Sequence, residues 1–216
     1  MSDFRKEFIA FCVESGALGF GSYVTKSGRT TPYFFNAGSF SNGAALDRLA
    51  QFYAKAILAS GVGYDMLFGP AYKGIVLAAA TAVALAREGR NVGYAFNRKE
   101  AKDHGEGGKT IGNPLAGRVL IVDDVLTAGT AVRESLEIIR TAGAVPAGVA
   151  ISLDRMERGP SGISAVREIE QQHGIPVVAI ANLDDLIGWL QSQAGMRKNL
   201  QAIDEYRQLY GAANHA

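Results

Sequence analysis

The feature that most constrains the fold is a regular alternation of short apolar runs with longer helical patterns over residues 66–180. The apolar runs, rich in β-branched residues, lie at residues 66–68, 92–96, 119–122, 149–153 and 177–180. The helical patterns lie at residues 75–87, 131–142 and 163–172. Runs that are apolar throughout are typical of strands buried on both faces, as in a parallel sheet flanked by helices. We therefore expect an α/β fold, mostly parallel, whose ligands bind beyond the carboxyl ends of the strands.

The 216 residues are enough for a single domain, and 48% of them are hydrophobic. Before the alternating region, apolar residues at helical spacing predict a helix over residues 4–16 that buries Cys12. Residues 23–26 and 31–36 flank a tight turn and predict a hairpin, and residues 44–60 predict a second helix. The stretches 184–190 and 200–209 are amphipathic and are interpreted as packing helices.

Charge and cysteine content exclude several classes of protein. Lys and Arg number 22 against 21 Asp and Glu, so the net charge of +1 provides no field for binding nucleic acid. A single cysteine, Cys12, rules out an intrachain disulfide and a cysteine-based zinc site. The first eight residues lack an export signal, and the apolar run 74–86 is too short to cross a membrane. We expect a cytoplasmic protein with neither a nucleic-acid nor a membrane partner.

The strongest local signal is VLIVDDVLTAGTA at residues 119–131: a buried strand, two acids, a turn of small residues and a helix start. After Val125 and Leu126, the small residues are Thr127, Ala128, Gly129, Thr130 and Ala131. Their backbone N–H groups and the helix N-terminus can converge on one phosphate. Asp123 and Asp124 would repel that phosphate, so they are expected to accept hydrogen bonds from sugar hydroxyls or to face a developing cation. A sugar phosphate satisfies both halves of the motif.

Simpler interpretations of this segment exist. Asp123 or Asp124 can merely cap the following helix, although capping explains only one of the two acids. Other phosphate motifs are absent: Gly108-Lys109-Thr110 resembles the end of a P-loop, but Asp103 occupies the position of its first glycine. No G-x-G-x-x-G follows a strand, so a dinucleotide cofactor is not indicated.

A basic, glycine-rich segment follows the strand at residues 92–96. Arg98, Lys99, Lys102 and His104 fall within seven residues, with three glycines directly after them. Such a segment cannot pack as core. Its composition fits equally a solvated loop and a lid that stabilises a departing diphosphate, which gains charge as its bond breaks.

Residues 119–131 resemble the diphosphoribosyl-binding motif of the type I phosphoribosyltransferases. Four further segments resemble the orotate phosphoribosyltransferases, and the resemblance extends over nearly the whole chain. These segments are KSGRTTPYFFNAG at 26–38, FGPAYKG at 68–74, FNRKEAKDHGEGG at 96–108 and SLDRMERG at 152–159. The resemblance implies the type I phosphoribosyltransferase fold, with about residues 1–40 forming an N-terminal hood over the base site and residues 97–110 forming a mobile catalytic loop.

The resemblance also implies roles for individual residues. Asp123, Asp124 and Lys102 would be the catalytic residues. The 5-phosphoribosyl 1-diphosphate would be bound by Lys26, Tyr72, Lys73, Arg98, Lys99, Lys102, His104 and residues 123–131. Orotate would be bound by Lys26, Phe34, Phe35, Thr127 and Arg155. The resemblance further implies a homodimer whose loop residues reach the neighbouring site, and a Mg²⁺ ion held mainly by the diphosphate, with no protein metal cage.

The reaction implied is transfer of ribose 5-phosphate to orotate, giving orotidine 5'-monophosphate and diphosphate in pyrimidine biosynthesis. Two other functions stay open on the sequence. One is a phosphoribosyltransferase that acts on a purine, and the other is a regulator that retains this fold, binds nucleic acid and senses the ribosyl donor. The net charge of +1 and the intact basic segment argue against the regulator.

Overall fold

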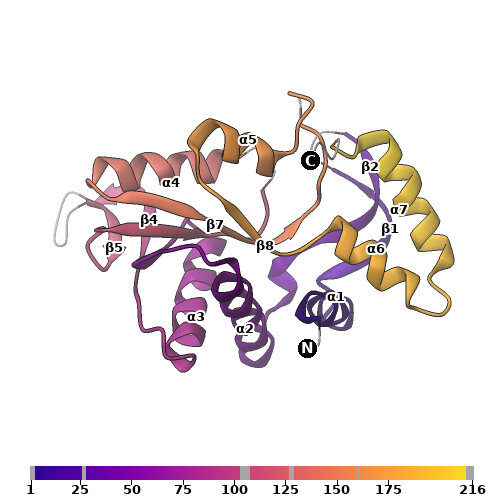
Figure 1. Ribbon diagram of the computed structural model, residues 1–216, viewed down its shortest axis with the longest axis horizontal. Helices are drawn as coiled ribbons and strands as arrows, with labels where there is room; N and C mark the ends of the chain where they lie inside the picture. Colours follow the sequence, from indigo (N-terminus) through magenta and orange to yellow (C-terminus); the bar gives the residue numbers. More distant parts are fainter. Residues whose placement is uncertain (1–2, 26–27, 103–107, 127–128, 160, 213–216) are drawn as a thin grey trace.

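A computed structural model describes residues 3–25, 28–102, 108–126, 129–159 and 161–212. Its centre is a six-stranded sheet with the strand order β5-β4-β3-β6-β7-β8 (Figure 1). The strands are β3 (Met66–Gly69), β4 (Gly93–Lys102), β5 (Gly108–Gly112), β6 (Arg118–Val122), β7 (Val145–Asp154) and β8 (Val177–Asn182). All neighbours pair in parallel except β4 and β5, which are antiparallel. The expected mostly parallel sheet is confirmed.

Helices cover both faces of the sheet. In Figure 1, α2 (Gly43–Ser60) and α3 (Lys73–Arg87) lie below it, whereas α4 (Thr130–Thr141) and α5 (Ala165–His173) lie above it. Gly61 ends α2 in the left-handed conformation, as the sequence indicates. None of the described helices combines the length and apolar content that crossing a bilayer requires.

The small subdomain beside the sheet is built from both ends of the chain. It contains α1 (Phe4–Glu14) and the antiparallel hairpin of β1 (Leu18–Val24) and β2 (Thr30–Phe35), as expected. A short 3-10 helix, Ala37–Ser39, leads from the hairpin to α2. The C-terminal helices α6 (Leu183–Gln191) and α7 (Arg197–Tyr210) complete the subdomain, because α6 packs on α1 and α7 packs on β2. The sequence predicts the two helices but not that they join the N-terminal hairpin.

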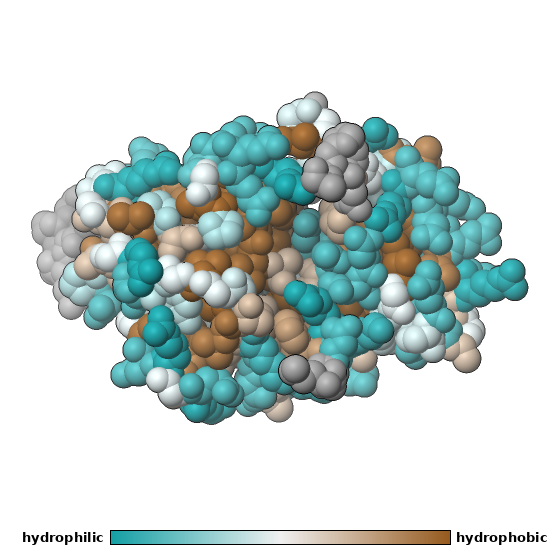
Figure 2. Space-filling model, in the orientation of Figure 1, coloured by the Kyte–Doolittle hydropathy of each residue, from teal (hydrophilic) through white to brown (hydrophobic). Residues whose placement is uncertain are grey.

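The alternating side chains of the strands fill two separate cores. Leu67, Leu120 and Ala150 belong to the core on the α2 and α3 side, which continues into the small subdomain. Phe68 and Ile121 belong to the second core, beneath α4 and α5. Figure 2 shows hydrophobic residues in the band between the helical layers and hydrophilic residues on the outer helix surfaces. Burial on both faces is why these strands are apolar without alternation.

The sheet differs from expectation at the β4 edge. Strand β4 continues to Lys102, six residues beyond the predicted end, and β5 pairs with it over Thr110 and Ile111. The basic segment is therefore largely a β-hairpin, of which residues 103–107 lie outside the described part. An edge hairpin needs backbone pairing but no apolar pattern, so its composition resembles that of a loop.

The turn between β3 and α3 depends on two glycines. A Cβ atom at Gly69 would overlap the backbone carbonyl of Gly74, and a Cβ atom at Gly74 would lie 2.9 Å from the carbonyl oxygen of Val122. The absence of side chains thus lets the start of α3 approach the ends of both β3 and β6. This approach brings Lys73 next to the acids that follow β6.

Gly69→Ala is therefore expected to destabilise the protein by about 2–3 kcal/mol, because the backbone must move to accept the new atom. The matched control is Gly188→Ala in α6, where the added methyl group meets nothing within 4 Å. That helical substitution should be neutral or stabilising by up to ~1 kcal/mol. Urea denaturation of both variants measures the difference, and equal stabilities would contradict the tight-turn explanation.

Candidate functional site

The candidate site lies at the carboxyl ends of β3, β6 and β7, where the parallel fold places ligands. Strand β3 leads into the turn that carries Tyr72 and Lys73, β6 leads into Asp123 and Asp124, and β7 leads into Arg155. Segments that are distant in the chain thereby meet at one edge of the sheet.

The two acids after β6 are half-buried and held by different partners. Asp123 Oδ1 accepts a hydrogen bond from the backbone N–H of Asp124 at 2.9 Å. Asp124 Oδ1 accepts one from the N–H of Val125 at 2.8 Å, and its Oδ2 pairs with Lys73 Nζ at 2.6 Å. Neither acid caps α4, which begins at Thr130 with Gly129 as its N-cap and no side-chain cap among the described residues, so the capping interpretation is wrong. The second oxygen of Asp124 faces a cation instead.

Tyr53 and Ser152 bond to the backbone carbonyl groups of this acidic turn. The Tyr53 hydroxyl on α2 donates to the carbonyl oxygen of Asp123 at 2.7 Å and lies 2.7 Å from the Ser152 hydroxyl. The backbone N–H of Ser152 donates to the carbonyl oxygen of Asp124 at 2.8 Å. The sequence analysis misses both residues, because a tyrosine in an amphipathic helix and a serine in an apolar strand carry no signal that they meet.

Burial changes the acidity of Asp123. Desolvation, followed by the nearby charge of Asp124, raises the pKa of Asp123 from 3.8 to about 6, while the Asp124 N–H and Lys73 oppose the shift. Lys73 therefore compensates Asp124 directly and Asp123 only weakly. Of the two acids in this turn, Asp123 is the one without a directly paired cation among the described residues.

The small-residue turn is described from Gly129 onward, and Thr127 and Ala128 lie outside the described residues. Val125 and Leu126 are half-buried and connect the acids to the turn. Gly129 is the N-cap of α4 at φ 67°, and no side-chain cap of α4 is present among the described residues. Thr130 is exposed and Ala131 half-buried, so the first turn of α4 keeps donors for an anion.

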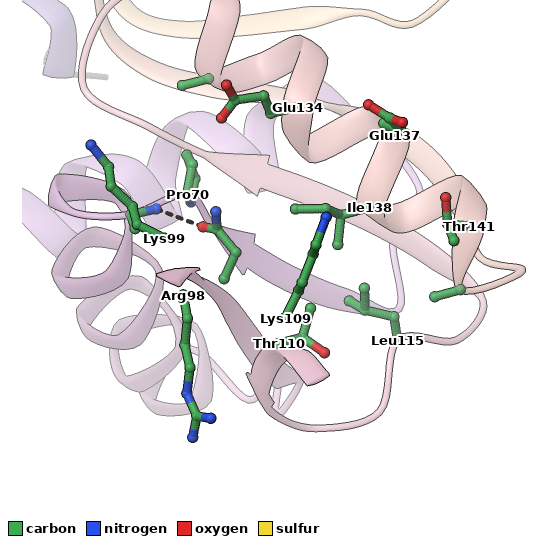
Figure 3. Close-up of a pocket in the computed structure, with 14 residues that line it drawn as sticks. Pro70, Arg98, Lys99, Lys109, Thr110, Leu115, Glu134, Glu137, Ile138 and Thr141 are labelled. Atoms are coloured by element: carbon green, nitrogen blue, oxygen red, sulfur yellow. Dashed lines mark hydrogen bonds between the residues drawn. The ribbon is translucent and has the colours of Figure 1, made fainter. Parts of the chain in front are cut away.

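The β3–α3 turn and the β4–β5 hairpin border an open groove against α4 (Figure 3). The groove has a volume of about 800 Å³ and includes Pro70, Asn97, Lys99, Lys109 and Glu134 among its lining residues. Asn97, which the sequence analysis does not identify, accepts a hydrogen bond on Oδ1 from the Ala71 N–H at 2.7 Å. This bond ties the hairpin to the β3–α3 turn, so the groove adjoins the acidic turn without containing it.

The basic residues of the hairpin are only partly described. Lys99 is exposed, with Nζ 4.9 Å from the centre of the exposed Tyr72 ring, and Arg98 extends in the opposite direction from β4 (Figure 3). The backbone of Lys102 continues β4, and His104 lies outside the described residues. Of these residues, Lys99 therefore lies against Tyr72, whereas Arg98 points away from Lys99.

The residues expected around the base come from the hairpin and from the end of β7. Phe34 is 48% exposed, whereas Phe35 is 8% exposed and packs near Phe40, so the pair points to opposite faces as predicted. Phe35 belongs to the core, which leaves Phe34 as the ring available to a ligand. Arg155 is half-buried and pairs with Glu157, and Lys26 lies outside the described residues.

No group of three or more His, Cys, Asp or Glu side chains placed to hold a metal ion occurs in the described part of the chain. Asp123 and Asp124 are the carboxylates that the site itself offers. Two adjacent carboxylates fit a Mg²⁺ ion that takes its other ligands from a bound substrate and water, as Mg²⁺ commonly does.

Comparisons with known proteins identify the family of the chain. A family model described as "Phosphoribosyl transferase domain" matches residues 38–175. The chain is 64% identical over 211 residues to the orotate phosphoribosyltransferase of Laribacter hongkongensis, covering 98% of this chain and 99% of that protein. It is 57% identical over 211 residues to the enzyme of that name from Neisseria meningitidis serogroup C, with the same coverage.

Solved structures give the same result. The crystal structure of orotate phosphoribosyltransferase from Francisella tularensis matches with a TM-score of 0.87 and 42% identity, over 95% of this chain and 99% of that one. An adenine phosphoribosyltransferase from Leishmania donovani matches with a TM-score of 0.53 and 16% identity, over 81% of this chain and 80% of that one. The second likeness concerns the fold alone.

The raised pKa of Asp123 makes a prediction for stability. Because the folded-state pKa lies above the unfolded value, ionisation of Asp123 lowers stability at neutral pH, and stability rises as pH falls from about 6 toward 4. Asp123→Asn should therefore stabilise the protein at pH 8 by up to roughly 3 kcal/mol, with a smaller gain at pH 4. Urea denaturation at both pH values measures the gain.

Asp65→Asn is the control, since hydrogen bonds from Arg118 lower the pKa of Asp65 and the sign reverses. That variant should lose stability at pH 8. A wild-type or lower stability of Asp123→Asn at pH 8 would contradict the desolvation explanation.

Proposed function

The chain belongs to the phosphoribosyl transferase family and, within it, to the orotate phosphoribosyltransferases, and from this premise we propose how its residues divide the reaction. The enzyme transfers ribose 5-phosphate from 5-phosphoribosyl 1-diphosphate to orotate and releases diphosphate. The product is orotidine 5'-monophosphate, in the de novo synthesis of pyrimidine nucleotides. The single observation that carries the assignment of the site is the acidic turn beside both Lys73 and the start of α4.

The 5'-phosphate binds at residues 127–131. The support comes from Gly129, Thr130 and Ala131, which open α4 without a side-chain cap among the described residues. A phosphate there gains from the N–H groups and the positive end of the helix dipole. Thr127 also contributes a hydrogen bond to the base.

Asp123 and Asp124 act on the ribose. The bond to diphosphate breaks through an oxocarbenium-like transition state, so positive charge develops on the ring as the leaving group departs. Carboxylates beside the ring stabilise that charge and accept hydrogen bonds from the ribose hydroxyls. No covalent protein nucleophile is required. This role fits two acids that the fold holds half-buried rather than in solvent.

The cations serve the diphosphate. Lys73 and Tyr72 lie at the start of α3, next to the acids, and Lys99 lies over the Tyr72 ring. Arg98 and Lys102 belong to β4, His104 follows them in the sequence, and these three residues complete the positive charge around the leaving group. A Mg²⁺ ion would be held by the diphosphate together with Asp123 and Asp124, and it would neutralise charge on the diphosphate.

Orotate lies between the hairpin of the small subdomain and the end of β7. Phe34 offers an exposed ring for stacking, and Arg155 with Lys26 provides positive charge for the carboxylate and ring oxygens of orotate. Phe35 contributes by fixing the strand from the core side. The small subdomain, with residues 1–40 as its N-terminal part, thereby forms the hood over the base.

The functional unit is a homodimer in which Lys99 and Lys102 reach the neighbouring subunit's site. The described surface supports a second copy, because Tyr72, Val76 and Val83 leave an exposed apolar stripe along α3. This stripe begins at the β3–α3 turn, so a partner seated on it would lie close to the site. The reaction takes place in the cytoplasm, whose reducing conditions suit the buried free thiol of Cys12.

One assay tests the assignment of the acids. Wild-type protein with orotate, 5-phosphoribosyl 1-diphosphate and Mg²⁺ should deplete the ultraviolet absorbance of orotate. Asp124→Asn should reduce the turnover number by about 100-fold or more while melting as a folded protein, because the carboxylate no longer stabilises the cation. Adenine and hypoxanthine in place of orotate are the controls for a purine enzyme. A near-normal rate for Asp124→Asn would show that this carboxylate does not act on the ribose.

Mixing two inactive variants tests the shared site. Lys102→Ala and Asp124→Asn each disable a site, but a mixed dimer has one site with an intact Lys102 from one subunit and an intact Asp124 from the other. After dissociation and random reassociation, activity should return to about a quarter of the wild-type level. Each variant carried alone through the same treatment is the control. A mixture no more active than its two components would show that each site is built from one subunit.

A further inference from the structure

A half-buried ion pair lies where β7 meets the hood. The Arg155 guanidinium donates from Nε to Glu157 Oε1 at 2.8 Å, and its Nη2 lies 2.6 Å from the same oxygen. The side chains are 16% and 19% exposed, so this pair is more buried than the Arg118–Asp65 and Arg207–Asp184 pairs. Pairing and hydrogen bonding at this depth restrict the orientation of the guanidinium.

Two hood residues complete the environment of Arg155. Its Nη2 donates to the Thr31 hydroxyl at 3.0 Å, and that hydroxyl donates to the carbonyl oxygen of Tyr33 at 3.1 Å. The Arg155 Cζ atom also lies 4.3 Å from the centre of the Tyr33 ring, a cation–π distance. Nη2 thus contacts both Glu157 and Thr31, and the Tyr33 ring covers one face of the guanidinium. Nη1 has no hydrogen-bond partner among the described residues.

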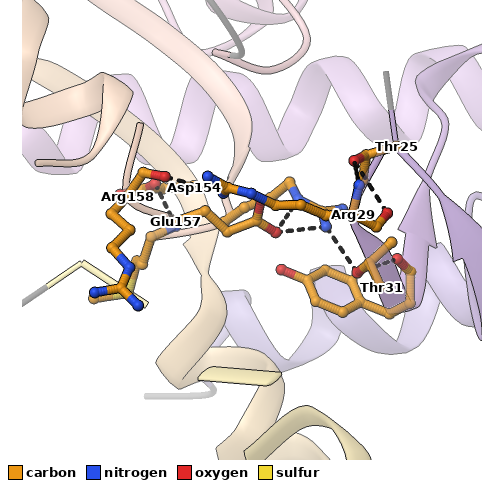
Figure 4. A network of polar contacts seen from close by, with 9 residues as sticks. Thr25, Arg29, Thr31, Asp154, Glu157 and Arg158 are labelled. Atoms are coloured by element: carbon orange, nitrogen blue, oxygen red, sulfur yellow. Dashed lines mark hydrogen bonds and ion pairs between the residues drawn. The ribbon is translucent and has the colours of Figure 1, made fainter. Parts of the chain in front are cut away.

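The backbone around Glu157 is fixed independently. Met156 adopts a left-handed conformation at φ 52°, which is uncommon for a residue other than glycine, and its N–H donates to Asp154 Oδ1 at 2.8 Å. The end of α7 pairs with the same segment, because Arg158 N–H donates to Tyr210 and Ala212 N–H donates to Met156. Figure 4 shows Glu157 and Asp154 on this segment and Thr31 on the hood facing it.

From these contacts we infer that Glu157 is a positioning residue for the base: it holds the Arg155 guanidinium so that Nη1 faces the orotate carboxylate. The inference rests on the proposed role of Arg155. Glu157 occupies the Nε side, Thr31 takes the remaining Nη2 proton, and the substrate is left with the two protons of Nη1. The C-terminal helix α7, expected to serve packing alone, therefore supports the base site.

Glu157→Ala is expected to raise the KM for orotate at least tenfold, because the guanidinium loses the partner that orients it. The turnover number at saturating orotate and the KM for the ribosyl donor should change less than about twofold, since neither the acids nor the donor site is touched. Glu157→Gln retains an oxygen acceptor and should restore the KM for orotate to within about threefold of wild type. Initial rates with each substrate varied in turn measure these constants.

Asp65→Ala is the matched control, because it breaks an arginine–carboxylate pair with Arg118 at the opposite ends of β3 and β6. It should leave both KM values unchanged. An unchanged or lower KM for orotate in Glu157→Ala would overturn the inference, and a lower value would show that Glu157 competes with the substrate. Equal effects on orotate and on the donor would also overturn it.

If Glu157→Ala does not fold, Thr31→Val tests whether the orientation of the Arg155 guanidinium determines the KM for orotate. It removes the hydroxyl that holds Nη2 and should raise the KM for orotate alone; an unchanged KM overturns the inference. Wild-type protein without orotate turnover would instead refute the proposed function, so the two failures are distinguishable.

Discussion

The placement of two carboxylates directly after a strand whose last four residues are buried is the constraint around which the site is built. Strand β6 lies at the centre of the sheet and is covered on both faces. Asp123 and Asp124 therefore follow directly on residues that are shielded from water. Charge there is costly unless it is solvated by protein groups. The fold provides Lys73 for Asp124, backbone N–H groups for both carboxylates, and the Tyr53 hydroxyl and the Ser152 backbone N–H for the carbonyl oxygens of the turn.

The local parts of this site could be predicted from the sequence, because neighbouring residues carry them. The acids and the small-residue turn lie within nine residues, and the strand before them is recognisable by its apolar run. The same holds for the parallel sheet and for the opposite directions of Phe34 and Phe35, which follow from strand geometry. Periodicity fixes which residues are buried, and strand ends fix where ligands gather.

The remaining parts depend on contacts between distant segments. Tyr53 and Ser152 are 99 residues apart, Lys73 and Asp124 are 51 apart, and Arg155 and Thr31 are 124 apart. No local pattern in one partner indicates the other. The β4–β5 hairpin was not predicted for a different reason. An edge hairpin of lysine, glycine and threonine is stabilised by backbone pairing, and its composition is that of a loop. The full extent of the small subdomain could not be predicted either, because no local pattern in α6 or α7 indicates that they pack on α1 and β2.

The distribution of charge relates the stability of the fold to its chemistry. Cations lie on the β3 and β4 side, where Lys73 and Lys99 flank Tyr72, and acids lie after β6. This separation of cations and acids matches the charges of a ribosyl donor. The phosphates of the donor are negative, and its ring becomes positive in the transition state. Asp124 forms an ion pair with Lys73, whereas burial and the charge of Asp124 raise the pKa of Asp123. Burial of Asp123 thus opposes its ionisation and costs folding stability, and under the proposed function the same carboxylate would gain from a positive charge that develops beside it, so catalysis and stability make opposite demands on it.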